Sequence, residues 1–399
     1  MFLRQLKHRL YLAFIRVLVR FVPAPAHLVY AGPGSSRRLC EHLLHAGVRR
    51  VLVVTDAPLR QLGVVDRALA GFEGASVELA FYDGVEPNPT FAQVDAGIAV
   101  LRGQGSEAVL AVGGGSSIDA AKVIAAGGSS DQDPRRWVGF GKVRHEVLPI
   151  YAIPTTAGTG SEATMGAVIS DSASGEKGVL SGSGLLPRAA ALDSDLMLGL
   201  PPAITAATGM DALTHAIEAY LSIWDRGERT AYSRCAVKLI FEHLRTAYVS
   251  GTDRAARDAM ALAAYYAGIA INQVNVGNVH AIAHQLGGRY GIPHGLANAL
   301  VLPHVLAFCR DQARERLAEL AVLVGAAGAG EDPRRQADAF IDAVRGLAAD
   351  VGIPETAAEL RSEDFDDLTR LAVKEASGYF TPRLLDAAST RAILRRIAG

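Results

Sequence analysis

The 399 residues are half hydrophobic, which gives enough apolar surface for two domains with a large core. Forty Lys and Arg residues are balanced by 41 Asp and Glu residues, so the net charge is −1 and there is no basic surplus for binding nucleic acid. The three cysteines, Cys40, Cys235 and Cys309, form no CxxC pair, and we expect them to be buried, reduced residues.

Residues 1–27 form a basic, apolar N-terminal extension, because the first acidic residue of the chain is Glu41. An amphipathic helix with Arg9, Arg16 and Arg20 on one side could contact an anionic membrane surface through residues 1–22. A mitochondrial-type presequence fits the composition equally well, whereas the apolar run is too short for a secretory signal. A helix that packs on this protein or on a partner subunit is the alternative we favour.

From residue 28 to about 195, short β-rich runs alternate with helical patterns. Strands are predicted at 51–55, 77–82, 109–112 and 148–153, and Ala/Leu-rich helices at 91–103 and 117–126. This alternation predicts a mostly parallel sheet with helices on both faces, which binds ligands at the carboxyl ends of its strands. We place this α/β dinucleotide-binding domain at residues 28–200.

A glycine-rich turn follows the predicted strand at 109–112. The segment Gly113-Gly114-Gly115-Ser116-Ser117 leads into a helix, where free backbone N–H groups and the helix dipole favour an anion. A cofactor pyrophosphate fits this turn. The alternative is a tight turn without a ligand, which normally needs only one glycine.

Two other features of this half concern a dinucleotide. Asp56 ends the strand at 51–55, where a carboxylate can bind ribose hydroxyls and repel a 2′-phosphate, but it is also an ordinary helix N-cap. The segment Gly158-Thr-Gly160-Ser-Glu-Ala163 imitates the GxGxxG fingerprint without its acidic partner, so we do not interpret it as one. Thr159 of this segment and the preceding Thr155 and Thr156 are better candidates for cofactor contacts.

Beyond Pro201-Pro202 the pattern becomes entirely helical. Long Ala/Leu/Arg-rich stretches are interrupted near Gly251, Gly291, Gly328 and Gly352, and no strand is predicted. Residues 201–399 are therefore assigned to an all-α domain.

The second half also contains two motifs of metal-ligand type. Asp211 and His215 are four residues apart and share one helical face, as do His280 and His284, and His294 follows a Gly/Pro-containing turn. Five donors thus compete for about four positions around one ion. A lone histidine in such a helix is usually a hydrogen-bonded core residue, but the clustering favours a divalent metal.

Four segments together resemble the iron-containing, or group III, alcohol dehydrogenases. They are Gly113-Gly-Gly-Ser-Ser-Ile-Asp119-Ala-Ala-Lys122, Pro154-Thr-Thr-Ala-Gly-Thr-Gly160-Ser-Glu162, Asp211-Ala-Leu-Thr-His215 and His280-x-x-x-His284 with Pro293-His294-Gly. The resemblance covers about residues 28–399. It implies a dehydroquinate-synthase-like fold, with an N-terminal Rossmann-like parallel-sheet domain, a C-terminal helical domain and a metal between them.

The resemblance also implies roles for individual residues. The metal ligands are expected to be Asp211, His215, His280 and His294, which leaves His284 as a catalytic proton-relay residue. Cofactor-binding residues are expected at Asp56, Gly113, Gly114, Gly115, Ser116, Asp119, Thr155, Thr156, Thr159 and Lys177. Met165-Gly166 departs from the bulkier or amide-bearing residues expected there, and the family does not explain the N-terminal extension.

The function that follows is hydride transfer between NAD(H) and a small-molecule alcohol or aldehyde, with Fe²⁺ bound and Zn²⁺ as the alternative metal. Maleylacetate reductase and a dehydroquinate-synthase-like lyase are the alternatives; both need cationic groups for carboxylates, and only Arg289 lies near the motifs. A membrane-associated scaffold would rest on residues 1–22 alone. No segment is long and apolar enough to span a bilayer, and we expect a cytoplasmic homodimer.

Overall fold

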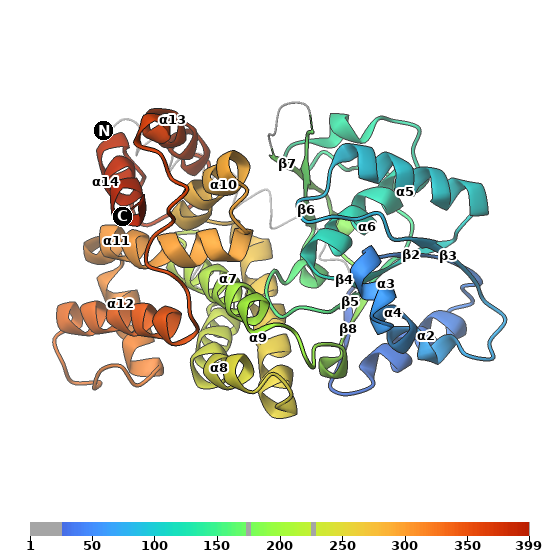
Figure 1. Cartoon of the computed structure of the whole chain (residues 1–399), viewed down its shortest axis with the longest axis horizontal. Helices are drawn as coiled ribbons and strands as arrows, with labels where there is room; N and C mark the ends of the chain where they lie inside the picture. Colours follow the sequence, from blue (N-terminus) through green and yellow to red (C-terminus); the bar gives the residue numbers. More distant parts are fainter. Residues whose placement is uncertain (1–25, 173–176, 225–228, 399) are drawn as a thin grey trace.

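The computed structural model describes residues 26–172, 177–224 and 229–398. It has two bodies that lie side by side, one built around a parallel sheet and one built of helices (Figure 1). Residues 1–22, for which a membrane contact was predicted, lie outside the described residues. His27, at the end of the predicted extension, belongs to the folded body, because its Nδ1 lies 2.7 Å from the carbonyl oxygen of Pro187 and its ring stacks on Tyr265.

The N-terminal body is organised around a six-stranded sheet in which every pairing is parallel. Its strand order is β1-β8-β5-β4-β2-β3. The four predicted strands are confirmed as β2 (Arg50–Val54), β3 (Glu78–Tyr82), β4 (Ala108–Gly113) and β5 (Ile150–Pro154), whereas β1 (Leu28–Ala31) and β8 (Ala189–Leu192) were not predicted. A two-stranded antiparallel hairpin of β6 (Gly166–Ser170) and β7 (Lys177–Ser181) was also not predicted.

Helices cover both faces of this sheet, as the alternation predicted. Leu52 and Val54 of β2 pack into the cluster that contains residues of α5 (Phe91–Gln104) and α6 (Gly115–Gly128). Val51 and Val53 point the other way, toward α2 (Ser35–His45) and α4 (Val64–Ala68), which follows the short helix α3 (Ala57–Gln61). The inner strands β2, β4 and β5 are buried on both sides, which explains their mainly apolar sequences, whereas the edge strands β1 and β3 are largely exposed or partly exposed.

The C-terminal body is helical throughout its described residues. Its helices are α7 (Pro202–Leu221), α8 (Arg229–Val249), α9 (Arg254–Val274), α10 (Asn278–Tyr290), α11 (His294–Leu323), α12 (Pro333–Asp350), α13 (Phe365–Ala376) and α14 (Ala387–Ala398). The predicted interruptions near Gly251, Gly291, Gly328 and Gly352 all fall between helices. None of the described helices combines the length and apolar content that crossing a bilayer requires.

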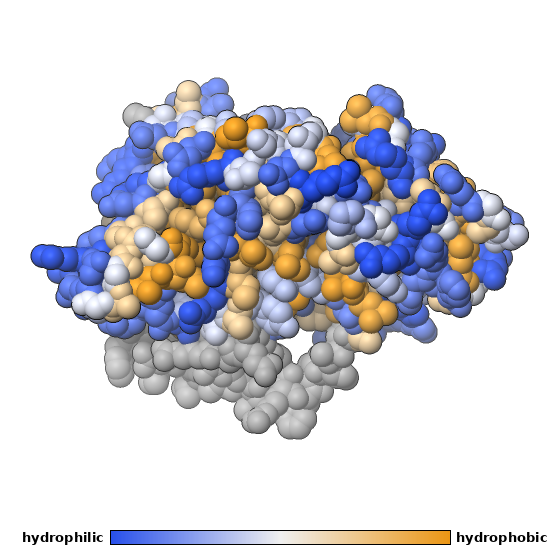
Figure 2. All heavy atoms as spheres, turned by 90° about the horizontal axis from the view of Figure 1, so that it is seen from below, coloured by the Kyte–Doolittle hydropathy of each residue, from blue (hydrophilic) through white to orange (hydrophobic). Residues whose placement is uncertain are grey.

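The two bodies meet through a contact between two glycines. Gly160 precedes the short 3₁₀ turn Ser161–Ala163, and Gly268 lies within α9. A Cβ added to Gly268 would lie 2.4 Å from the carbonyl oxygen of Gly160, so backbone packs directly on backbone. On the face shown in Figure 2, hydrophobic and hydrophilic residues are interspersed over both bodies wherever the described residues are visible.

One minor expectation from the sequence was wrong. Cys40 and Cys309 are buried and unpaired as predicted, but Cys235 is exposed. It lies on α8, whose outer face is in contact with solvent.

Candidate metal centre

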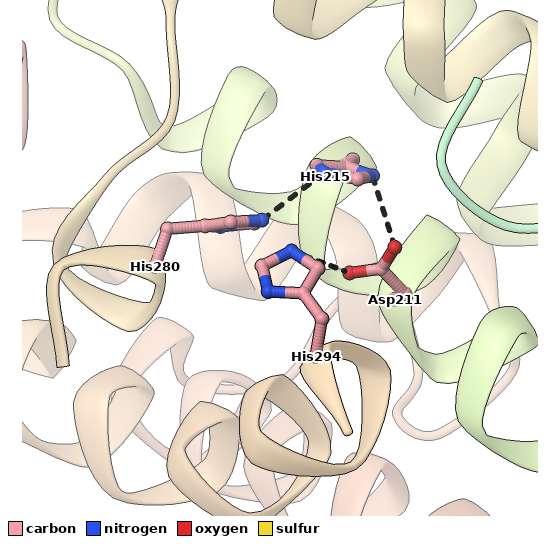
Figure 3. Close-up of side chains that lie close together, drawn as sticks. All are labelled: Asp211, His215, His280 and His294. Carbon is pink, nitrogen blue, oxygen red and sulfur yellow. Dashed lines mark hydrogen bonds and ion pairs between the residues drawn. The ribbon is translucent and has the colours of Figure 1, made fainter. Parts of the chain in front are cut away.

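Four side chains from three helices of the C-terminal body converge on one point. Asp211 and His215 lie one turn apart on α7, His280 lies on α10, and His294 is the first residue of α11. One ligand atom from each of the four lies within 4.8 Å of all the others (Figure 3). The turn that returns His294 to the site is shorter than the sequence suggested, because α10 continues to Tyr290 and only Gly291, Ile292 and Pro293 separate the helices.

The two imidazoles at the centre of this cluster face each other. Nε2 of His280 lies 3.0 Å from Nε2 of His215. The carboxylate of Glu218 accepts a hydrogen bond from Nδ1 of His280 at 2.7 Å, and it also accepts the backbone N–H groups of Gly277 and Val279. Because Nδ1 of His280 carries the proton, its Nε2 presents a lone pair to the cluster, as a metal ligand does.

Asn298, which the sequence analysis missed, lies beside the same atoms. Its Nδ2 is 2.7 Å from Oδ1 of Asp211, 3.1 Å from Nε2 of His280 and 3.2 Å from Nε2 of His294. An amide has two hydrogens and therefore satisfies at most two of these three acceptors. The three acceptor atoms around Asn298 therefore outnumber its two hydrogens, as expected where a cation binds. The only sequence signal for Asn298 was its position one turn after His294.

Burial keeps two histidines of the cluster, His280 and His294, neutral. It lowers the pKa of His280 well below its usual value, and the neighbouring His215 and His294 lower this pKa further. Burial lowers the pKa of His294 to about 3, although Asp211 opposes the shift. Metals bind neutral imidazole, so the three histidines and the single carboxylate suit a divalent ion of borderline softness.

His284 lies next to the cluster but its Nδ1 binds a different partner. Its ring stacks on that of His294 with centroids 5.4 Å apart, and it meets the ring of His280 edge-on at 5.7 Å. Nδ1 of His284 donates to Oε1 of Glu375 on α13 at 2.6 Å. His284 is not one of the four grouped side chains, and its role as a proton relay stays a prediction.

The glycine-rich turn has the geometry of an anion-binding helix start. Gly114 precedes α6 and no side chain caps this helix. A Cβ on Gly113 would lie 2.4 Å from Oγ of Ser117, and one on Gly115 would lie 2.5 Å from the side chain of Thr159. The bare backbone at these positions lets the strand, the helix and the threonine segment approach closely, and Ser116 follows in the first helical turn.

The other predicted cofactor residues on the sheet domain have partners of their own. Oδ1 of Asp56 accepts the N–H of Leu59 at 2.9 Å, so this carboxylate is the N-cap of α3, as the alternative interpretation proposed. Lys177 Nζ donates to Asn88 Oδ1 at 2.8 Å. It also reaches the helical domain, because a Cβ added to Gly287 of α10 would lie 3.5 Å from it.

Thr155 is buried and Thr156 is partly exposed. The hydroxyl of Thr156 would lie 3.4 Å from a Cβ on Gly114, so the threonine segment runs alongside the glycine turn. Thr159 Oγ1 accepts the backbone N–H of Ser161 at 3.2 Å.

Asp119 and Lys122 fix the segment that carries these threonines. Asp119 accepts hydrogen bonds from the Ser161 hydroxyl at 2.5 Å and from the N–H of Val168 at 2.8 Å. Lys122 Nζ is fully buried and donates to the carbonyl oxygens of Ser161 and Gly166 at 2.8 and 2.7 Å. Burial lowers the pKa of Lys122 to about 8. The contacts of Asp119 are thus with this segment, and cofactor binding by Asp119 stays a prediction.

Comparisons with known proteins agree with the fold and this site. The family model "Iron-containing alcohol dehydrogenase" matches residues 26–194, and the model "Fe-containing alcohol dehydrogenase family, C-terminal" matches residues 205–398. The chain therefore belongs to the iron-containing alcohol dehydrogenase family, whose members have a dehydroquinate-synthase-like fold.

Individual relatives cover nearly the whole chain. A 1,3-propanediol dehydrogenase of Klebsiella pneumoniae is 38% identical over 371 residues, which are 92% of this chain and 96% of that protein. A lactaldehyde reductase of Escherichia coli strain K12 is 37% identical and covers 88% of this chain and 93% of its own length. The crystal structure of a 1,3-propanediol oxidoreductase superposes with a TM-score of 0.90 at 37% identity and covers 93% of this chain and 97% of its own.

Proposed function

We propose that this protein is a metal- and NAD-dependent oxidoreductase that transfers a hydride between NAD(H) and an alcohol or aldehyde. The observation that carries the proposal is a cluster in which the acceptor atoms around Asn298 outnumber its two hydrogens. The cluster consists of Asp211, His215, His280 and His294. Fe²⁺ is the metal we favour because of the family, and Zn²⁺ suits the same ligands because none of them is a thiolate. A divalent ion bound there would supply the Lewis acidity that makes an alcohol hydroxyl acidic and an aldehyde carbonyl electrophilic.

Residues of the chain would bind the cofactor and handle the proton. Gly113, Gly114, Gly115 and Ser116 would bind the pyrophosphate through backbone N–H groups, and Asp56 would bind the adenosine ribose with the oxygen that does not cap α3. Thr155, Thr156, Thr159, Asp119 and Lys177 would contact the rest of the cofactor. His284 would accept the hydroxyl proton of the alcohol, because its Nε2 is free to act as a base once Nδ1 is bound to Glu375.

The site favours an uncharged substrate over a carboxylated one. Arg289, the cation that both alternatives would need, forms an ion pair with Asp364. Lys177 is engaged with Asn88. The similarity to enzymes named 1,3-propanediol dehydrogenase and lactaldehyde reductase supports small alcohols and aldehydes. A maleylacetate-reductase-like activity and a dehydroquinate-synthase-like lyase activity are therefore less well supported.

The test combines metal analysis of the purified protein with NADH formation on a panel of primary alcohols and diols. We expect about one divalent ion per chain and NAD-dependent turnover, and His280→Ala and His294→Ala should each lose both. Bound metal and turnover that survive either substitution would overturn the proposal. Activity with NADP alone would contradict the role of Asp56, and activity with carboxylated substrates alone would favour the maleylacetate alternative.

Three further expectations belong to the same proposal. A cytoplasmic homodimer is expected from the family resemblance, and sedimentation of the purified protein would test the oligomeric state. Residues 28–200 and 201–399 would be the cofactor-binding and metal-binding domains. Contact of residues 1–22 with anionic lipid would be contradicted if deleting them left co-sedimentation with lipid vesicles unchanged.

A further inference from the structure

Two histidines one turn apart on α10 are each held by a carboxylate from a distant part of the chain. Nδ1 of His280 donates to Glu218 of α7 at 2.7 Å, and Nδ1 of His284 donates to Glu375 of α13 at 2.6 Å. The first pair orients a grouped metal ligand. The second pair orients a histidine outside that group, so its effect should be on the reaction and not on metal binding.

The carboxylate of Glu375 is fixed by three donors. Oε1 accepts from Nδ1 of His284 and from the hydroxyl of Tyr379, both at 2.6 Å, and Oε2 accepts from Nε2 of Gln285 at 2.7 Å. The side chains of His284 and Glu375 are only 15% and 27% exposed. A partly buried carboxylate that accepts three hydrogen bonds has little freedom to turn away from the imidazole.

This arrangement determines which ring nitrogen of His284 can react. Because Nδ1 is bound to an acceptor, the proton of the neutral ring lies on Nδ1 and the lone pair lies on Nε2. The ring is also held between neighbours, since it stacks on His294 with an interplanar angle of 19°. The hydrogen bonds among the described residues leave Nε2 of His284 without a protein partner.

We propose that Glu375 is a positioning residue that selects the Nδ1–H tautomer of His284 and so presents Nε2 to the substrate hydroxyl. The proposal rests on the proposed function. In it, Glu375 affects the reaction only through its hydrogen bond with His284. An amide in place of the carboxylate could donate to Nδ1 instead of accepting from it. It would then favour the opposite tautomer at almost unchanged volume, as in triads where an Asp is replaced by Asn.

If Glu375 only held α10 against α13, any substitution that loosens this helix contact should lower activity equally. Glu375 joins α10 to α13. The same two segments are also joined by Arg289 and Tyr290 of α10, which both bind Asp364, the residue that precedes α13; the Tyr290 hydroxyl donates to it at 2.7 Å. Arg289→Met therefore loosens the same helix contact without touching His284. It is the matched control for any loss that comes only from helix docking.

The activity test is a double-mutant cycle on the metal-loaded enzyme with a primary alcohol and NAD. We expect Glu375→Gln to lower kcat by about 10–100-fold and to leave metal content and the KM for NAD within about twofold. In a His284→Asn background the same substitution should change kcat by less than about twofold, because the group through which it acts is gone. An equal loss in both backgrounds, or an equal loss in Arg289→Met, would overturn the proposal.

A second measurement does not depend on turnover. In Zn²⁺-loaded protein with ¹⁵N-labelled histidine, the signal removed by His284→Asn should show a protonated Nδ1 in the wild type and a shift toward protonated Nε2 in Glu375→Gln. An unchanged tautomer would overturn the inference. A wild type that oxidises no alcohol would refute the proposed function, while the tautomer measurement would still test the role of Glu375.

Discussion

Nε2 of His215 and Nε2 of His280 face each other across 3.0 Å in a buried site where Glu218 already binds the other nitrogen of His280. Nε2 of His280 offers a lone pair there, and a cation bound at this point would take the place of its hydrogen bond with His215. We therefore expect Zn²⁺ or Fe²⁺ to stabilise the protein, by about 2.7 kcal/mol at a free concentration of 100 Kd. Thermal unfolding with and without metal measures this, and identical midpoints would contradict a metal at this site.

Glu218→Gln should weaken metal binding. Glu218 fixes the tautomer and orientation of His280, and loss of such a partner typically costs 10–100-fold in affinity. Competition with a chelator gives the dissociation constant. Glu375→Gln is the matched control, because Glu375 holds His284, and it should retain wild-type affinity. Equal weakening in both variants would show that neither carboxylate acts through its own histidine.

Gly268→Ala should destabilise the protein, although alanine is the better helix former. The new Cβ would lie 2.4 Å from the carbonyl oxygen of Gly160, and backbone on both sides cannot easily give way. We expect a loss on the order of 2 kcal/mol in denaturant unfolding. Gly346→Ala within α12 is the control, because nothing lies within 4 Å of its added Cβ, and it should be neutral or stabilising by about 1 kcal/mol.

Glu162→Gln should stabilise the protein at alkaline pH and have little effect in acid. Glu162 is 3% exposed, and burial raises the pKa of its carboxyl from 4.5 to about 7, with Lys122 opposing the shift. A raised pKa in the folded state gives stability that is fully present below the unfolded value and is lost as pH rises through 7.

The neutral amide avoids this loss, so the advantage of Gln over Glu should grow between pH 5 and pH 8 to about 3 kcal/mol. Unfolding of both proteins at each pH measures the difference. An advantage that is constant with pH would show that Glu162 does not titrate in this range.

Asp56→Asn separates the two roles of this residue. Asparagine caps helices as well as aspartate, so α3 should remain and the unfolding free energy should change by less than about 1 kcal/mol. The charge that repels a 2′-phosphate is lost, and the preference for NAD over NADP in kcat/KM should fall by about tenfold, or roughly 1.4 kcal/mol. An unchanged preference would mean that Asp56 is only a cap.

The parts of the fold that could be predicted from the sequence have a strong local signal. Strands β2 and β4 are runs of Val and Leu buried on both faces, and glycines mark the helix ends near 251, 291 and 352. Strand β8 is Ala-Ala-Ala-Leu, whose local preference is helical, and only its place between β1 and β5 makes it a strand.

The residues of the site also divide into those with a local sequence signal and those that only tertiary packing brings together. The i, i+4 spacing of Asp211 and His215 predicted that both belong to the metal cluster, because one helical turn brings such side chains together. The same spacing of His280 and His284 also offered His284, which lies outside the cluster and which only the family resemblance excluded. Glu218 and Glu375 were missed, since they lie 62 and 91 residues from their histidines and tertiary packing alone joins them. Asn298 had a local signal, but an amide near a histidine is too common to be informative.

The Gly160–Gly268 contact also limits how the two bodies can move. No side chain lies between the two backbones. We therefore expect a relative rotation of the sheet body and the helical body to turn about this contact, because the two backbones leave no room to slide past each other. The glycine-rich turn belongs to the sheet body and the histidine cluster to the helical body. A rotation about this contact would therefore change the distance between them.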